Sequence, residues 1–404
     1  MLTKYGAFPG LTGRVISISP ERIPAMSAHR TGLVYDERYL SHDTGTQTTV
    51  RMRDGSFSIA PESHPSSVSI TLRIKQFLDG AGLTAQMQPI PTRAATEDEL
   101  AVYHTREYIE GVRAHVHGGP MKGPWGEIEI DTPLSSGSFE AAIYAAGGAM
   151  NGARAVMDGE VRNAYALLRP PGHHAMSNRA MGFCIFNNAV AAAHYARKTY
   201  GLERVMIVDW DVHHGNGTQD AFYADPGILF ISLHQHNWYP KLAGELEQVG
   251  TGAGAGYTVN VPLPAGTGDR GYVAAFEQLV IPIGLRYRPQ LILISAGQDA
   301  NWLDPLAQMM VTMAGFRKMS ELMLALAQEV CEGRLLMLQE GGYSAAYVPY
   351  CTAAAVEPLV GLDLGIVDLY AGSSEVERSA TIFTSETQRA LSEARKWHKH
   401  WWKI

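Results

Sequence analysis

Carboxylates and imidazoles are concentrated in one short stretch, residues 208–217, which has the sequence VDWDVHHGNG. It follows the apolar run 204–208, which is typical of a buried parallel strand. Burying such ionisable side chains is costly unless a metal ion or a hydrogen-bonded network holds them. Asp211 and His213 are two residues apart, so they point to the same side of an extended segment. The spacing suits a metal ion, and a salt-bridged loop after a strand is the alternative.

Polar residues with suitable chemistry follow three further apolar runs. Open α/β sheets place their ligand sites at the carboxyl ends of strands, so we expect these residues to converge on the same site. The conjunction carries more weight than any one segment, because a lone histidine pair is more often a hydrogen-bonded loop. The runs 164–168, 291–295 and 335–338 lead into His173 and His174, into Asp299, and into Tyr343, respectively.

These residue types favour metal-assisted hydrolysis. Asp211, His213 and Asp299 would supply three ligands and leave a position open for water and substrate, as catalytic zinc requires. A metal lowers the pKa of bound water and polarises a carbonyl, but a base and a proton donor for the leaving amine are still needed. The pair His173 and His174 suits that work.

Three neighbouring residues complete the predicted chemistry. The imidazoles need partners on their far nitrogens to fix the tautomer, and Asp209 and Asn216 are available for this. Tyr343, on a turn with two glycines, could donate its hydroxyl to a tetrahedral oxyanion. A phenol is a suitable donor because it stays protonated at neutral pH.

The elements that must position these residues alternate along the chain. Alternating strands and helices predict an α/β fold, with a mostly parallel sheet covered by helices on both faces. The residues between 119 and 137 are expected to form a long loop. Further strands are expected at 31–36, 205–208 and 228–233, and helices at 66–81, 97–117 (ended by 118–120), 138–158, 186–200, 270–287 and 312–330.

We expect residues 1–404 to form a single domain, with an N-terminal extension (1–30), a core (31–361) and a C-terminal extension (362–404). The last extension should contain an amphipathic helix that begins with a capping box of Ser385 and Gln388. Either extension could pack on the core or on another subunit, so a homo-oligomer is left open. The residues expected on the docked face of the helix are Leu391, Ala394, Trp397, Trp401 and Ile404.

Composition excludes several classes of protein. The formal net charge of −7 argues against nucleic acid or an anionic membrane as the main partner. Three cysteines without paired spacing indicate neither a disulfide framework nor a cysteine zinc knuckle. No apolar stretch reaches transmembrane length, and the N-terminus lacks the pattern of a secretory signal. These features predict a cytoplasmic protein.

The sequence resembles the zinc-dependent histone deacetylase superfamily, which includes bacterial histone-deacetylase-like amidohydrolases and acetylpolyamine amidohydrolases. The resemblance extends from about Thr31 to about Pro358, and its Pro-Pro-Gly-His-His form and Asn216 are similar to the class II branch. It rests on seven ordered blocks: Pro170-Pro171-Gly172-His173-His174-Ala175, Gly182-Phe183-Cys184, residues 209–217, Ser232-Leu233-His234, Asn260-Val261-Pro262-Leu263-Pro264, Ser295-Ala296-Gly297-Gln298-Asp299 with Asp304-Pro305-Leu306, and Glu340-Gly341-Gly342-Tyr343.

The resemblance implies the arginase/deacetylase fold and assigns roles to the residues above. It implies His174 as the acid/base histidine, His173 as an electrostatic partner oriented by Asp209, and Tyr343 as the tyrosine that stabilises the transition state. One Zn²⁺ would be held by Asp211, His213 and Asp299. A K⁺ ion would sit beside it on Asp209, Asp211, His213, Ser232 and Leu233, and a second K⁺ site would match Phe222, Asp225, Ile228 and Tyr257.

The resemblance also implies a tunnel for an acylated lysine. Its walls would be Phe183, Tyr239 and Leu306, with Gly341 and Gly342 beside them, and Asp131 would be the rim carboxylate that holds the substrate backbone. Tyr239 stands where the family commonly has Phe, so the wall is expected to be more polar. Phe183 and Leu306 could instead be core residues, and Asp131 could be the N-terminal residue of the helix 138–158.

The sequence therefore predicts a zinc-dependent deacylase that hydrolyses the amide of an N-acyl-lysine or a related acylated amine. An amidohydrolase of acetylpolyamines or other small acyl-amines is the alternative. An arginase-like ureohydrolase would need more carboxylates to hold two Mn²⁺ ions about 3.5–4 Å apart, whereas residues 298–301 offer only one ligand. A non-catalytic acyl-binding protein would not need the histidine pair and Tyr343.

Overall fold

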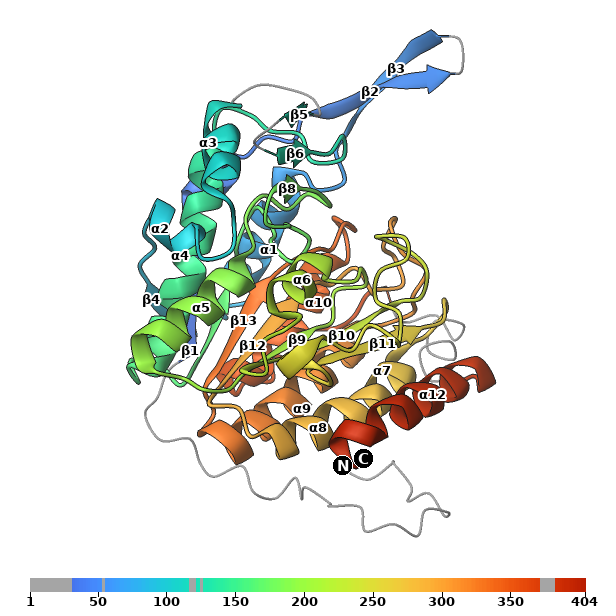
Figure 1. Cartoon of the computed structure of the whole chain (residues 1–404). Helices are drawn as coiled ribbons and strands as arrows, with labels where there is room; N and C mark the ends of the chain where they lie inside the picture. Colours follow the sequence, from blue (N-terminus) through green and yellow to red (C-terminus); the bar gives the residue numbers. More distant parts are fainter. Residues whose placement is uncertain (1–30, 53–54, 116–120, 124–125, 371–381) are drawn as a thin grey trace.

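A parallel sheet of eight strands forms the centre of the molecule, with strand order β11-β10-β9-β12-β13-β7-β1-β4 (Figure 1). The structure is a computed structural model that describes residues 31–52, 55–115, 121–123, 126–370 and 382–404. Every neighbouring pair in this sheet is parallel, which confirms the predicted α/β class. The strands are β1 (Thr31–Val34), β4 (Gln88–Ile90), β7 (Asn163–Ala166), β9 (Val205–Asp209), β10 (Ile228–Gln235), β11 (Thr258–Leu263), β12 (Leu291–Ala296) and β13 (Leu335–Gln339).

Helices cover both faces of the sheet, because side chains of its buried strands alternate between two apolar cores. In β9, for example, Met206 and Val208 enter one core, and Val205 and Ile207 enter the other. The first core is completed by α1 (Val68–Gly80), α7 (Asp269–Ala275), α8 (Ile281–Tyr287), α9 (Met313–Cys331) and α10 (Val348–Val360), and the second by α4 (Ser138–Met157) and α5 (Asn188–Tyr200). Short segments are α6 (Asn216–Phe222), η1 (Glu37–Ser41), η2 (Thr84–Gln86), η3 (Gly252–Gly254) and the π-helical η4 (Phe276–Val280).

The two outermost strands were not predicted. β4 has three residues and contains Pro89, and β11 contains Pro262. Proline is tolerated at a sheet edge because one side of an edge strand makes no ladder hydrogen bonds. Both strands therefore lack the long apolar run that identifies a central strand.

Two predicted elements were wrong in detail. The single helix at 97–117 is two helices, α2 (Glu97–Leu100) and α3 (Arg106–Ala114), because Thr105 caps a new N-terminus by accepting from Tyr108 N. The loop 119–137 contains two short strands, β5 (Met121–Gly123) and β6 (Gly126–Ile128), and β6 pairs with β8 (Arg179–Ala180). Residues 118–120 lie outside the described residues.

A hairpin of β2 (Thr46–Met52) and β3 (Gly55–Ser63) extends away from the body (Figure 1). The sequence prediction missed this hairpin, although the dipeptide Asp54-Gly55 is a typical hairpin turn signal and the apolar residues on either side of it alternate with polar ones.

The C-terminal helix α12 (Ser385–Trp402) packs on β11 and α7, so its predicted docking on the body is confirmed. Its cap is Thr384, whose side chain accepts from Thr387 N, and not the predicted Ser385. The predicted face was wrong at Trp397, which is 40% exposed, whereas Trp402 is buried and donates its indole N–H to Gly256 O at 2.8 Å. The buried residues are Thr387, Leu391, Ala394, His398 and Trp402, a stripe that follows the helical period more closely than the predicted one.

The N-terminal extension 1–30 and residues 371–381 lie outside the described residues, so the division into extensions and their predicted contact with a second subunit stay predictions. Among the described residues, no helix combines the length and apolarity needed to span a bilayer.

We predict that Trp402→Ala lowers the free energy of unfolding by roughly 3 kcal/mol, the low end for a buried tryptophan because it lies at a helix end. Trp397→Ala, on the same helix but largely exposed, should change it by about 0.5 kcal/mol or less. Thermal and urea unfolding of the two variants measures the difference. Equal losses would contradict the assigned docking face.

Candidate active site

The predicted chemical groups come from four strands that lie side by side in the sheet. β9, β12, β13 and β7 are consecutive neighbours, and each ends at the same edge. The segments that follow them carry Asp211 and His213, then Asp299, then Tyr343, and then the pair His173 and His174. The predicted convergence of strand ends is therefore observed.

Asp211, His213 and Asp299 form a buried donor set. His213 Nδ1 lies 3.2 Å from Asp211 Oδ1 and 3.0 Å from Asp299 Oδ2. One ligand atom of each residue lies within 4.8 Å of the others. The three side chains thus meet as the sequence predicted for a metal site.

The electrostatics of this donor set favour a cation. Burial raises the pKa of Asp299 well above its ordinary value, and the charge of Asp211 adds to this effect. Burial alone would lower the pKa of His213, but its bonds to Asp211 and Asp299 outweigh it and raise this pKa. Two carboxylates forced together in a buried site are stabilised when a metal ion lies between them.

Backbone amides fix the orientation of both carboxylates. Val212 N donates to Asp299 Oδ1 at 2.7 Å, and His213 N donates to Asp211 Oδ1 at 2.9 Å. Gly341 N donates to Asp211 Oδ2 at 2.8 Å. A Cβ at Gly341 would lie 2.4 Å from Asp299 Oδ2, so only glycine fits here. The structure places Gly341 directly against the donor set, deeper than the predicted tunnel wall.

The two histidines have different partners. His173 Nδ1 lies 3.0 Å from Asp209 Oδ2, whereas His174 Nδ1 lies 2.8 Å from Asn216 Oδ1. Burial opposes the charging of His173, but Asp211 and Asp209 raise its pKa to about 10. Burial and the neighbouring His173 lower the pKa of His174 well below its ordinary value. The two rings therefore differ: the neighbouring carboxylates favour the protonated form of His173, and burial favours the neutral form of His174.

Glu340 lies behind His173 and was given no role from the sequence. Its carboxylate accepts from Gly172 N at 2.7 Å, His173 N at 3.2 Å and Ser295 Oγ at 3.1 Å. Burial raises its pKa to about 7. Its place directly before the two glycines and Tyr343 was the available signal, but the hydrogen bonds to a distant segment depend on the tertiary fold.

Asp304 is a second residue that sequence reasoning missed. Its Oδ2 accepts from Tyr343 N at 2.8 Å and its Oδ1 accepts from Leu306 N at 3.0 Å. Asp304 thus holds the backbone of Tyr343 and the backbone of Leu306, a predicted tunnel residue, close to each other. Burial raises the pKa of the Tyr343 phenol, which keeps its proton available for donation.

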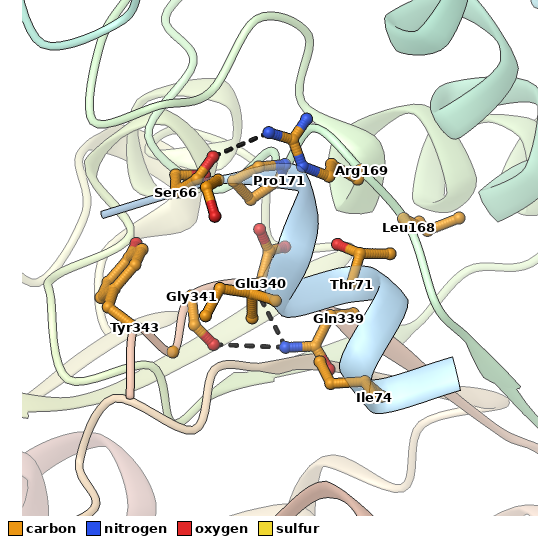
Figure 2. A pocket seen from close by; sticks show the side chains of 13 residues that line it. Ser66, Thr71, Ile74, Leu168, Arg169, Pro171, Gln339, Glu340, Gly341 and Tyr343 are labelled. Carbon is orange, nitrogen blue, oxygen red and sulfur yellow. Dashed lines mark hydrogen bonds between the residues drawn. The ribbon is translucent and has the colours of Figure 1, made fainter. Parts of the chain in front are cut away.

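A pocket adjoins Tyr343 and Glu340 between α1 and the end of β13 (Figure 2). At one side the buried guanidinium of Arg169 donates to Ser66 O at 2.7 Å and to His42 O at 2.6 Å. Because Ser66 accepts through its backbone carbonyl, this contact does not depend on the side chain at position 66.

Two of the predicted tunnel residues contact aromatic rings of the site. The ring of Phe183 lies 5.4 Å from that of Tyr343, and the ring of Tyr239 lies 5.0 Å from that of His174. Leu306 O accepts from the indole of Trp238 at 2.6 Å. Phe183 and Leu306 are half-buried and are not among the residues of the apolar cores.

Asp131, the predicted rim carboxylate, accepts a hydrogen bond from the Tyr239 hydroxyl at 3.1 Å. It is not the cap of α4, because that position is occupied by Gly137. The alternative interpretation of Asp131 as a helix-terminal residue was therefore wrong.

The residues predicted for potassium are also placed by the structure. Ser232 Oγ lies 2.9 Å from His234 Nδ1, beside the strand that carries Asp209. At the second predicted site, the Asp225 carboxylate accepts from Arg197 and from Gly227 N. A cation there would depend mainly on backbone carbonyls, because Arg197 already neutralises the Asp225 carboxylate.

The profile described as Histone deacetylase domain matches residues 64–359. The chain belongs to the histone deacetylase family. It is 38% identical over 365 residues to the "Histone deacetylase-like amidohydrolase" of Pseudomonas aeruginosa, which covers 90% of this chain and 95% of that protein. It is also 38% identical to the "Probable deacetylase" of Archaeoglobus fulgidus, over 83% of this chain and 88% of that one.

The solved structures agree with this family. A structure described as "Crystal Structure of HDA15 HD domain" matches with a TM-score of 0.79 and 33% identity, over 93% of this chain and 96% of that chain. The predicted arginase/deacetylase fold is confirmed by this match. Membership of the histone deacetylase family supports the hydrolysis of acyl-amides as the class of activity.

We predict that Asp211→Ala loses bound zinc and activity together, because it removes one of three donors and leaves two that must bind the ion alone. Metal content after gel filtration in zinc-containing buffer measures this. Asp363→Ala, an exposed residue, is the control and should retain stoichiometric zinc. Retention of one zinc per chain in Asp211→Ala would count against Asp211 as a ligand.

Proposed function

We propose that this histone deacetylase family member is a zinc-dependent deacylase that hydrolyses the amide of an N-acyl-lysine side chain to a carboxylate and a free amine. An acetylated polyamine or another small acyl-amine is the alternative substrate. The observation that carries the proposal is the unequal histidine pair beside the donor set of Asp211, His213 and Asp299.

The donor set fits one zinc ion. It contains two carboxylates and one imidazole, a ligand type and number found at catalytic zinc sites. Bound there, zinc would activate water and polarise the acyl carbonyl. The other nearby carboxylates are engaged elsewhere: Asp209 with His173, and Asp304 with the amides of Tyr343 and Leu306. This argues against the two-metal arrangement of an arginase-like ureohydrolase.

His174 is the proposed proton carrier. With Asn216 accepting from its Nδ1, the neutral ring presents Nε2 as the proton acceptor. His174 would take a proton from the attacking water and return it to the leaving amine. The charged His173, held by Asp209, would stabilise negative charge that develops next to it.

Tyr343 is the proposed donor to the oxyanion. Its raised pKa keeps the hydroxyl protonated, and its backbone is fixed by Asp304. Such a donor stabilises the tetrahedral oxyanion more than the planar amide, so it acts on the transition state.

The charges at the rim favour an acyl-lysine over a polyamine. Glu127 and Glu129 could attract a polycation, but Arg179 pairs with them at 3.2 Å and 3.5 Å. Lys122 lies 3.5 Å from Glu127 as well. These pairings reduce the net negative charge that a polyamine would need.

Potassium is a second proposed cofactor, of a structural kind. Asp209 and Ser232 lie next to each other in paired strands, and carbonyls of Asp211, His213 and Leu233 are the further proposed ligands. The second proposed site, on carbonyls of Phe222, Asp225, Ile228 and Tyr257, would bind more weakly because Arg197 already neutralises the Asp225 carboxylate.

We predict that His174→Ala and Tyr343→Phe each lower kcat on an acetyl-lysine peptide by roughly 100-fold or more while zinc stays bound. The control is Tyr350→Phe, on α10, whose ring packs on Phe77 away from the donor set. It should keep near wild-type turnover. Near-normal rates for either site variant would refute the role given to that residue.

A substrate panel tests the proposed function itself. The zinc-loaded enzyme is assayed on acetyl-lysine and longer acyl-lysine peptides, an acetylated diamine and an acetylated polyamine. A higher kcat/KM on the peptides is expected. Preference for the polyamine would support the alternative substrate, and zinc binding without hydrolysis of any acyl-amine would support a binding protein instead.

A further inference from the structure

The hydroxyl of Tyr239 makes this wall of the predicted tunnel more polar than a phenylalanine would. The Tyr239 ring lies edge-on to His174 at 5.0 Å and to His213 at 6.0 Å, a packing role that a phenylalanine could also fill. The hydroxyl instead reaches outward and donates to Asp131 Oδ2 at 3.1 Å. One side chain therefore connects the acid/base histidine to the rim carboxylate.

Phe183, a second predicted wall residue, is connected to the same carboxylate. Phe183 has a φ of +68°, a left-handed conformation that is uncommon outside glycine, so its surroundings must hold it. Its backbone N–H donates to Thr132 Oγ1 at 2.9 Å, and this hydroxyl donates to Asp131 Oδ1 at 2.7 Å. Thr132 is buried, so the contact is shielded from water.

Both walls thus end on the dipeptide Asp131–Thr132, and each oxygen of Asp131 is engaged by a hydroxyl donor. A carboxylate accepts about four hydrogen bonds, so lone pairs remain for an incoming N–H group. Asp131 is only partly buried, which leaves these lone pairs accessible. These two hydrogen bonds hold the Asp131 carboxylate in one orientation as a hydrogen-bond acceptor.

We propose that Tyr239 is a positioning residue that, with Thr132, fixes the Asp131 carboxylate at the tunnel mouth for substrates with N–H donors beside the acylated amine. This inference rests on the proposed deacylase function and specifies its substrate class. Peptide amides next to an acyl-lysine present such donors, whereas a simple N-alkyl amide does not. Tyr239 would therefore increase the preference of the enzyme for peptide-like substrates.

The test compares two probes that share the scissile amide. One is a tripeptide with a central acetyl-lysine and blocked ends, and the other is N-butylacetamide, which lacks the flanking N–H donors. Tyr239→Phe should raise KM for the tripeptide about three- to tenfold, the cost of ordering one freed side chain on binding. Its kcat should stay within about twofold, and kcat/KM should fall much less for N-butylacetamide than for the tripeptide.

A double-mutant cycle with Asp131→Ala separates positioning from other effects. If Tyr239 acts through Asp131, Tyr239→Phe should have no further effect on tripeptide KM once Asp131 is removed. Thr132→Val should raise this KM, and Thr132→Ser, which keeps the hydroxyl, should restore it. Additive losses, or an equal loss of kcat on both probes, would overturn the proposal and assign Tyr239 to the catalytic histidine.

The same cycle in thermal unfolding does not depend on turnover. Tyr239→Phe and Asp131→Ala should lower the melting temperature non-additively, because they remove the same hydrogen bond. Additive shifts would overturn the contact on which the proposal rests. A wild-type enzyme that hydrolyses neither probe would instead refute the proposed function, and the unfolding cycle would still decide whether the contact forms.

Discussion

Two buried carboxylates that share one imidazole are the constraint on which the site depends. Asp211 and Asp299 both contact His213, at the ends of neighbouring strands where water is excluded. Charges of like sign in such a place are destabilising without a cation, and the surrounding amides hold both carboxylates in place rather than separating them. The fold therefore keeps the donor set organised for a metal at the expense of electrostatic stability.

The residues around the donor set also hold its carboxylates and the adjacent segments in place. Glycine at 341 allows the backbone to approach the carboxylates, and Glu340 and Asp304 hold the adjacent segments through backbone amides. The unequal partners of the two histidines then divide their work, since a carboxylate stabilises the charged ring and an amide does not. The proposed roles of His173 and His174 therefore differ because their hydrogen-bond partners differ, although both side chains are imidazoles.

The sequence predicted the features that depend on local pattern. Apolar runs that end in Asp, His or Tyr located the four central strands and their site residues, because a buried parallel strand has a clear signature. The edge strands β4 and β11 lacked that signature. The partners Asp209 and Asn216 were predicted correctly because they lie within the same motif as the ligands.

The remaining features depend on contacts between distant segments. Glu340 reaches residues 172 and 173, and Thr132 reaches Phe183, and no local spacing indicates either contact. In α12 the predicted face was correct at Leu391 and Ala394, but from Trp397 onward it lay one residue too early, because His398 and Trp402 are the buried positions. Tyr239 was recognised as a departure, but its bond to Asp131 required the fold.

Titration of metal-free enzyme with zinc, followed by hydrolysis of an acetyl-lysine peptide, measures how many zinc ions the site needs. We expect no turnover without metal, a linear rise with added zinc, and saturation at one equivalent per chain. Turnover that is independent of zinc, or that saturates only at two equivalents, would contradict a single zinc ion on Asp211, His213 and Asp299.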